Sequence, residues 1–273
     1  MIICPFLILM LITSPVNPQL KFARRVREGK EPTVMFVEGE RLVEECLRSH
    51  NTLLAAFHTP EPGWRTGAVI TELYQRNCPV YETAAEAFEV VSDTVNSQGI
   101  IIIAERPQWD FATIIKQQSN LLLALDAVQD PGNVGAIMRT AEAAGVQGII
   151  ALKGTVDCFA PKTLRSAMGA AFRLPIVTEI EPAQLIEKCH ALQITIAATA
   201  SEASLVYSDY AWSQPTMVIL GNEARGISVE IMTACDVRMQ IPLSPPVESL
   251  NVAAAAAVIL FEAARQRRIK LSL

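Results

Sequence analysis

Short, uninterrupted apolar runs recur through the second half of the chain. They cover residues 121–125, 148–152, 195–198 and 217–220. Strands that are buried on both faces have this pattern, whereas a half-exposed strand alternates apolar and polar residues. Helical patterns separate the runs, as at 134–144 and 182–192. This alternation predicts an α/β domain with a mostly parallel sheet between helices.

The first half of the chain predicts a smaller α/β unit. Its expected elements are a basic helix at 19–29, a strand at 34–37, a helix at 40–49 and strands at 52–57 and 99–104. The segment 105–120, with a proline, amides and weak periodicity, is typical of a linker. We therefore expect domains at 13–108 and 120–273, joined by a linker at 109–119.

Residues 1–12 are apolar but make a poor secretory signal. No lysine or arginine precedes the apolar run, and no small-residue cleavage pattern follows it. Pro5 interrupts the run, which stays below the roughly 18 to 20 apolar residues that a membrane span needs. We interpret residues 1–12 as a disordered or strand-like extension, with Met10 as an alternative initiator.

The cysteines and histidines do not indicate a disulfide framework or a metal site. The six cysteines are widely spaced and include no C-x-x-C pair. The chain has only three histidines, His50, His58 and His190, which is few for a catalytic triad or a histidine-ligated metal. Reduced thiols of this kind are typical of a cytoplasmic protein, so we expect a cytoplasmic location and no metal.

Composition excludes disorder but gives an ambiguous picture of partners. The chain of 273 residues is 51% hydrophobic and 19% charged, which is typical of a globular protein. Its net charge of −5, taken alone, argues against a nucleic-acid partner. The charge is uneven, however, because residues 31–110 hold 13 acidic against 5 basic side chains, while residues 20–30 hold 5 basic against 1 acidic. The net charge therefore describes the bulk of the surface and not the first helix.

The first segment with candidate chemistry follows the predicted strand at 121–125. This strand ends at Asp126, and Asn133 is well placed as the N-cap of the next helix. Gly135 and Arg139 share one face of that helix, where the glycine lets a backbone approach and the arginine can reach it. Taken alone, the segment is better explained by a solvated arginine on an amphipathic helix. It also lacks the G-x-G-x-x-G dinucleotide pattern.

A second segment, 217–228, runs from a buried strand into Gly221, Asn222 and Glu223, with Gly226 closing the turn. Loops at the carboxyl ends of strands bind ligands in open α/β sheets. The alternative is an ordinary turn between a strand and a helix with an exposed glutamate.

The third segment, 239–268, combines a proline-rich connection with an alanine-rich helix. We expect a short strand at 241–243 and an N-cap at Ser249. Small side chains in the first turns allow close packing, although the alanines also suit any helix.

Together these segments resemble one known family. The patterns N-x-G-x3-R-T-A, L-G-N-E-x2-G-I and I-P-x5-E-S-L-N-V follow one another in the order of the three motifs of the SpoU/TrmH family. Its members are AdoMet-dependent RNA ribose 2′-O-methyltransferases of the SPOUT superfamily. The resemblance spans about residues 120–268, and the segments at 17–21 and 36–39 resemble the substrate-binding domain found in many members.

The resemblance implies a fold and an assembly. We expect a trefoil-knotted parallel-sheet domain, preceded by a small L30e-like α/β domain that binds the RNA substrate. The expected assembly is a homodimer through the knotted domain, with S-adenosyl-L-methionine as cofactor. Ribosomal RNA is favoured over transfer RNA because of the separate N-terminal domain.

The resemblance also implies the site residues. The cofactor site would comprise Thr199, Leu220, Gly221, Asn222, Glu223, Gly226, Ile241, Leu243, Ser249, Leu250, Asn251 and Ala253. The catalytic or near-catalytic positions would be Asn133, Arg139, Glu223, Ser249 and Asn251. One departure is Pro245, where many members have a glycine, so a contact made by that N–H in relatives is absent here. Ser166 and Gly169 match a further family segment, with no role assigned.

Basic residues suggest where the RNA binds. The resemblance implies that the arginine at the position of Arg139 activates the 2′-hydroxyl. A guanidinium is a poor base, however. We expect Arg139 to bind the target phosphate and to stabilise negative charge on the 2′-oxygen. The remaining RNA contacts are expected from Lys21, Arg24, Arg25, Arg27 and Lys30. A C-terminal cluster, Arg265, Arg267, Arg268 and Lys270, is equally explained by favourable charge at a helix end.

Three alternatives remain open at the level of the sequence. The chain could be a transfer-RNA ribose methyltransferase, or an RNA-binding protein that keeps the fold without catalysis. A conventional nucleotide-binding α/β enzyme is disfavoured, because both the G-x-G-x-x-G pattern and a Walker A loop are missing.

Overall fold

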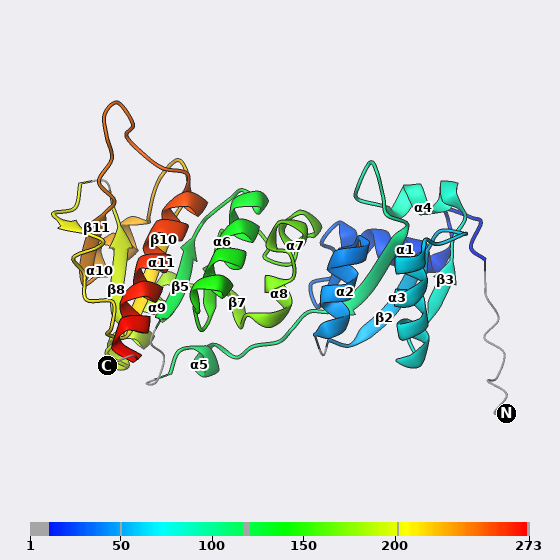
Figure 1. Cartoon of the computed structure of the whole chain (residues 1–273), viewed down its shortest axis with the longest axis horizontal. Coiled ribbons are helices and arrows are strands. Elements are labelled where there is room, and N and C mark those ends of the chain that lie inside the picture. The colour runs from blue at the N-terminus through cyan, green and yellow to red at the C-terminus, as the bar shows by residue number, and fades with distance from the viewer. Residues whose placement is uncertain (1–10, 50, 117–120, 201, 272–273) are drawn as a thin grey trace. The chain divides into compact units, whose positions relative to one another are not determined.

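The computed structural model describes residues 11–49, 51–116, 121–200 and 202–271, with side chains up to residue 268. The chain divides into two compact units (Figure 1). The first reaches to Arg106 and also includes residues 159–161, and the second comprises residues 107–158 and the chain from Lys162 on. The domain boundaries predicted from the sequence stay a prediction. Most of the predicted extension, residues 1–10, and the C-terminal Lys270 side chain lie outside the described residues.

The first unit is a four-stranded mixed sheet with helices on both faces. Its elements are α1 (Pro18–Arg27), β1 (Val34–Glu38), α2 (Glu40–Arg48), β2 (Leu53–His58), α3 (Trp64–Gln75), β3 (Val80–Glu82), α4 (Ala85–Val91) and β4 (Ile100–Glu105). The strand order is β1-β4-β2-β3, with β4 antiparallel to both of its neighbours and β2 parallel to β3. Helices α1 and α4 share one core with Phe36, Phe57 and Ile101. Helix α2 packs on β1 and β4, and α3 packs on α2 and β3.

Glu38, at the end of β1, is a buried carboxylate that holds the connection between α4 and β4. It accepts hydrogen bonds from the hydroxyls of Ser92, Thr94 and Ser97 and from the N–H of Asp93. A buried charge needs such donors. Glu38 therefore fixes the loop at residues 92–97, which the sequence did not indicate.

The second unit is a seven-stranded parallel sheet. Its elements are α5 (Phe111–Ile114), β5 (Leu121–Asp126), α6 (Pro131–Ala144), β6 (Ile149–Leu152), α7 (Pro161–Ala167), α8 (Ala170–Arg173), β7 (Ile176–Ile180), α9 (Pro182–Ala191), β8 (Thr195–Thr199), β9 (Leu205–Val206), β10 (Thr216–Gly221), α10 (Val229–Ala234), β11 (Val237–Gln240) and α11 (Val252–Leu271). The order is β7-β6-β5-β10-β8-β11-β9. The predicted parallel α/β fold is confirmed, while the knot stays a prediction.

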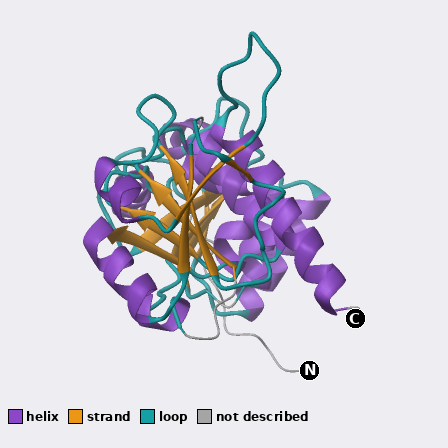
Figure 2. Ribbon diagram, turned by 90° about the vertical axis from the view of Figure 1, so that its left-hand side faces the viewer, coloured by secondary structure: helices purple, strands orange, loops and turns teal. Residues whose placement is uncertain are grey.

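Both faces of this sheet are covered, as the apolar runs predict. Helices α5, α9 and α10 contribute Ile114, Leu185 and Ile231 to a core on one face. Helix α11 packs on α6 and on β10, and both helices bury apolar side chains. Figure 2 shows the strands enclosed by helices. The residues predicted as a linker include α5, whose Ile114 is buried in this core.

Pairing register brings the carboxyl ends of four strands together. Gly221 at the end of β10 lies beside Asp126 at the end of β5, and β10 also pairs with β8. Met239 of β11 lies beside Thr199 at the end of β8. The loops that carry the three motifs therefore leave the sheet at one edge.

Three local predictions are wrong. Helix α6 begins at Pro131, and its N-cap is Asp130, whose carboxylate accepts from the N–H of Asn133, so Asn133 lies in the first turn. The expected strand at 241–243 does not form, because β11 ends at Gln240. Helix α11 begins at Val252, and Asn251 rather than Ser249 accepts hydrogen bonds from the first-turn N–H groups of Ala253 and Ala254.

Candidate functional site

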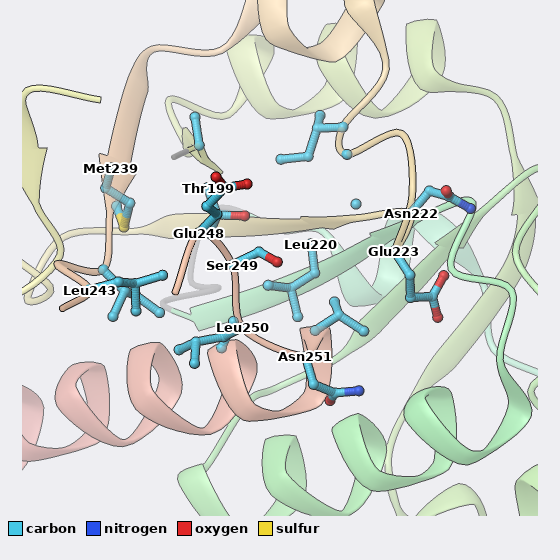
Figure 3. Close-up of a pocket in the computed structure, with 17 residues that line it drawn as sticks. Thr199, Leu220, Asn222, Glu223, Met239, Leu243, Glu248, Ser249, Leu250 and Asn251 are labelled. Atoms are coloured by element: carbon cyan, nitrogen blue, oxygen red, sulfur yellow. The ribbon is translucent and has the colours of Figure 1, made fainter. Parts of the chain in front are cut away.

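A cavity of about 390 Å³ opens at the carboxyl ends of β8, β10 and β11. It is lined by Thr199, Ala200, Leu220, Gly221, Asn222, Glu223, Gly226, Ile227, Met239, Ile241, Leu243, Glu248, Ser249, Leu250, Asn251, Val252 and Ala255. Figure 3 shows Met239 and Leu243 at one end and Asn222 and Glu223 at the other. Ligand pockets of roughly 300–1,000 Å³ combine apolar walls with a few polar groups in this way.

The lining includes all but one of the residues predicted to bind the cofactor. The exception is Ala253, whose N–H donates to the side chain of Asn251 inside the helix. Met239 and Glu248 also line the cavity, but the sequence analysis did not select them. Glu248 is the glutamate of the I-P-x5-E-S-L-N-V pattern, so the motif itself gave a signal for it. Pro245 is not part of the lining.

The polar end of the cavity is organised around the carboxylate of Glu223. Its oxygens accept hydrogen bonds from the N–H groups of Gln129 and Asp130, at 3.2 Å each, and from the amide of Asn133 at 2.9 Å. The amide of Asn251 donates in turn to the side-chain oxygen of Asn133 at 3.0 Å. One network thus joins the three motif segments, and in the sequence Asn133 is 90 residues from Glu223 and 118 from Asn251.

Hydrogen bonding keeps Glu223 ionised. Partial burial alone would raise its pKa, but the hydrogen bonds from Asn133 and from the N–H groups of Gln129 and Asp130 outweigh this effect and hold the pKa below the ordinary value of 4.5. The folded state therefore gains stability from Glu223 above its ordinary pKa and loses it as the pH falls through the lowered pKa.

Replacing Asn133 by alanine is expected to raise the pKa of Glu223. The substitution removes a side-chain donor that favours the charged carboxylate. Titration of the Glu223 carboxyl carbon by NMR measures the change, with a wild-type midpoint below 4.5 and a higher midpoint in Asn133→Ala. Asn51→Ala, which lies in the first unit, is the matched control and should leave the midpoint unchanged. An unchanged midpoint in Asn133→Ala would contradict the network.

Asn222 fixes the shape of the loop that follows β10. Its amide donates to the carbonyl of Ala127 at 2.8 Å, and its side-chain oxygen accepts from the N–H groups of Ala224 and Arg225 at 3.0 Å. Ala127 has a positive φ of 56°, which an L-residue adopts only when its surroundings require it. Asn222 therefore joins the loop after β5 to the loop after β10.

Gly221 lies where no side chain can be placed. A Cβ atom there would come within 2.4 Å of backbone atoms of Gly226 and Ile227. The main chain of Asn222 and Gly226 closes the turn through two hydrogen bonds, of 3.0 and 2.9 Å. The loop is thus tight because its first residue is glycine.

Arg139 lies outside the cavity lining. It is an exposed residue on α6, six positions beyond Asn133 and thus about 9 Å further along the helix axis. No hydrogen bond or ion pair joins Arg139 to another residue in the described part of the chain. Its guanidinium is therefore available to a ligand.

Ser166 and Gly169 shape the packing and the backbone of the short helices α7 and α8. The hydroxyl of Ser166 donates to the carbonyl of Gly132, and its Cβ lies against Gly135, where an added Cβ would approach it to 2.4 Å. Gly169 has a left-handed conformation at the start of α8. Gly135 and Ser166 thus allow α7 to approach α6 closely.

The basic residues of α1 are only partly free. Arg25 pairs with Glu31 and Lys30 pairs with Glu28. Arg27 donates to the carbonyls of Val91 and Ser92 at the end of α4, so its guanidinium has a structural partner. The other two members of the predicted basic face are Lys21, which is exposed, and Arg24, which is half-buried.

The C-terminal cluster is largely occupied within its own unit. Arg265 forms two hydrogen bonds with Glu262, and Arg267 donates to the carbonyl of Gln214. These contacts favour the structural interpretation of the cluster.

The described residues show neither a metal site nor a membrane-spanning helix. No group of three or more histidine, cysteine or acidic side chains in this part of the chain is placed to hold a metal ion. In the same part, no helix is both long and apolar enough to cross a bilayer. Five cysteines, Cys46, Cys78, Cys158, Cys189 and Cys235, are free thiols.

Comparisons with known proteins match both units. Residues 120–261 match the SpoU rRNA methylase family, and residues 36–109 match a domain described as RNA 2′-O ribose methyltransferase substrate binding. The 23S rRNA (guanosine(2553)-2′-O)-methyltransferase RlmP of Bacillus subtilis is 32% identical over 92% of this chain and 97% of its own length.

Solved structures give the same result. The AdoMet-bound rRNA methyltransferase of Sinorhizobium meliloti has a TM-score of 0.83 and 30% identity, and the match covers 93% of this chain and 97% of that one. The SpoU methyltransferase AviRb of Streptomyces viridochromogenes has a TM-score of 0.82 and 25% identity, over 93% and 99%. The resemblance found in the sequence is therefore confirmed, and the chain belongs to the SpoU family of RNA methyltransferases.

Proposed function

We propose that this protein transfers a methyl group from S-adenosyl-L-methionine to a ribose 2′-hydroxyl of ribosomal RNA. The observation that carries this proposal is the hydrogen-bond network of Asn133, Glu223 and Asn251 beside a ligand-sized cavity. The network is built from the three segments that resemble the family's motifs. Relatives named as 23S rRNA 2′-O-methyltransferases support the reaction and favour ribosomal over transfer RNA.

The cavity suits the proposed cofactor. Its apolar end, with Met239, Leu243 and Leu250, offers a surface for a flat base such as adenine. Its polar end, with Asn222, Glu223 and Ser249, offers groups for hydroxyls and for a positive charge. When bound, the cofactor supplies an electrophilic methyl group on a sulfonium.

The chain's own residues position the ribose hydroxyl that accepts the methyl group and stabilise the negative charge that develops on its oxygen. Transfer would form a bond from the ribose oxygen to the methyl carbon and break the bond from that carbon to sulfur. S-adenosylhomocysteine would leave as the neutral product, and the hydroxyl proton would pass to water. Arg139 binds the target phosphate and stabilises negative charge on the 2′-oxygen. Asn133, Glu223, Ser249 and Asn251 hold the reacting groups in line, which supplies much of the rate.

The first unit contributes RNA binding. The match of residues 36–109 to a substrate-binding domain supports this role. Of the predicted basic face, Lys21 and Arg24 are the main contributors, because Arg25 and Lys30 pair with acidic side chains and Arg27 is bound to the end of α4.

The proposed assembly is a knotted homodimer in the cytoplasm. The dimer is the assembly that the family resemblance implies. The five free cysteines support the cytoplasmic location. Sedimentation equilibrium would detect the dimer, and a monomer at micromolar concentration would contradict it.

Transfer of labelled methyl groups tests the proposal. Ribosomal and transfer RNA from a strain that lacks the gene are incubated with the protein and methyl-labelled cofactor. We expect label in 23S ribosomal RNA. Label in transfer RNA alone would identify a transfer-RNA enzyme, and cofactor binding in calorimetry without any transfer would identify a non-catalytic RNA-binding protein.

A further inference from the structure

Two arginines of the second unit differ from the others in having no partner. Arg173 binds Glu142, Arg265 binds Glu262 and Arg238 donates to the carbonyl of Met232. Arg165, Arg267 and Arg268 also have partners. Arg139 and Arg225 are exposed, and neither side chain makes a hydrogen bond or an ion pair within the described part of the chain. Since most arginines of a protein with net charge −5 are paired, an unpaired one beside a cavity points to a ligand.

The loop fixes the backbone of Arg225 while leaving its side chain free. The side chain of Asn222 accepts the N–H of Arg225 at 3.0 Å, and the turn is closed by hydrogen bonds between Asn222 and Gly226. Gly226, which follows Arg225 directly, and Glu223, two positions before it, both line the cavity. Arg225 is thus held at the mouth of the cavity without contributing to its wall.

The nearby carboxylate does not neutralise Arg225. Glu223 accepts its hydrogen bonds from Gln129, Asp130 and Asn133, and forms no ion pair with Arg225 among the described residues. The guanidinium therefore keeps its donors and its full charge for an outside partner. An anionic group that it can bind through two parallel hydrogen bonds is the best match, and phosphate is such a group.

We propose that Arg225 binds a backbone phosphate of the RNA at the mouth of the cofactor cavity, beside the nucleotide that accepts the methyl group. The inference rests on the proposed function, because it takes the RNA as the polymer that reaches this site. Arg139 on α6 and Arg225 on the loop after β10 then contact different phosphates of one strand. Arg225 is a substrate-binding residue, which sets the affinity and the register of the strand rather than the chemical step.

Arg225→Gln tests this role without disturbing the loop. The guanidinium makes no hydrogen bond or ion pair within the described residues, so its loss leaves the turn held by Asn222. Binding of a single-stranded RNA oligonucleotide is measured by filter retention at several salt concentrations. The dissociation constant should rise about tenfold at low salt, as expected for the loss of one charged contact. The slope of log K against log salt should become shallower by about 0.7, the change expected for one phosphate contact.

Matched variants separate this role from a general effect of charge. Arg265→Gln removes the same charge from the same unit, but its guanidinium is bound to Glu262, so the slope should stay at the wild-type value. Arg225→Lys should recover most of the slope, because it restores the charge. Steady-state methyl transfer with Arg225→Gln should show a higher KM for RNA and a kcat within about twofold of wild type. The dissociation constant for the cofactor in calorimetry should not change.

The outcomes that overturn the inference are distinct from those that overturn the proposed function. Arg225→Gln with a wild-type slope, or with the same behaviour as Arg265→Gln, excludes the phosphate contact. A wild-type protein that does not bind the oligonucleotide excludes it as well. RNA binding does not need methyl transfer, so a protein that binds RNA through Arg225 but transfers no methyl group overturns the proposed function alone.

Discussion

Arg139→Ala is expected to lower the rate of methyl transfer by about 100-fold or more while leaving cofactor affinity unchanged. Loss of one group that stabilises developing negative charge has effects of this size in other enzymes. Arg139 is exposed on α6 and does not line the cavity, so the cofactor should bind as in the wild type. Single-turnover transfer from labelled cofactor measures the rate, and calorimetry measures the affinity.

Two further variants make the test of Arg139 specific. Arg139→Lys keeps the charge but loses the paired donors, and should retain part of the activity. Arg173→Ala removes another exposed arginine of the same unit, one that is bound to Glu142, and should keep wild-type turnover. Near-normal turnover of Arg139→Ala would show that the proposed role of this residue is wrong.

Gly221→Ala is expected to weaken cofactor binding on the order of 100-fold, because a displacement of about 1 Å in a site has effects of this size. The added Cβ would lie 2.4 Å from the carbonyl carbon of Gly226 and from the nitrogen of Ile227. These are backbone atoms, which cannot rotate away as a flexible side chain can. The loop must therefore shift, and with it Asn222 and Glu223, which line the cavity.

Gly67→Ala is the matched control for this prediction. A Cβ at Gly67 meets nothing within 4 Å, and the residue lies inside α3, where alanine is the better helix former. Its cofactor affinity should equal that of the wild type. Thermal unfolding checks that Gly221→Ala remains folded. A folded Gly221→Ala protein with normal affinity would contradict the account of the loop.

The buried strands were predictable because both faces of the sheet are covered. The apolar runs correspond closely to β5, β6, β8 and β10, and the motif order placed the loops that follow β5 and β10. Helix starts were harder to predict, because Asp130 and Asn133 are both good N-caps. Pro131 gave the available signal, since proline favours the first helical position and indicates Asp130 as the cap.

The other errors depend on partners that are distant in the sequence. β11 ends at Gln240 because its register is set by pairing with Thr199 of β8 and Val206 of β9. The guanidinium of Arg27 is bound to α4, more than sixty residues away, which its place in a basic helix does not indicate. The N–H groups of Gln129 and Asp130 donate to Glu223, and this could not be predicted because every residue except proline has a backbone N–H.

The chemical position of the transferred methyl group tests the central claim most directly. Ribosomal RNA labelled by the protein is digested to nucleosides and separated by mass spectrometry. We expect a nucleoside whose extra methyl group is on the ribose 2′-oxygen, so that it stays with the sugar when the base is cleaved off. The variant Arg139→Ala should not form this product. A methyl group on a base would contradict the account.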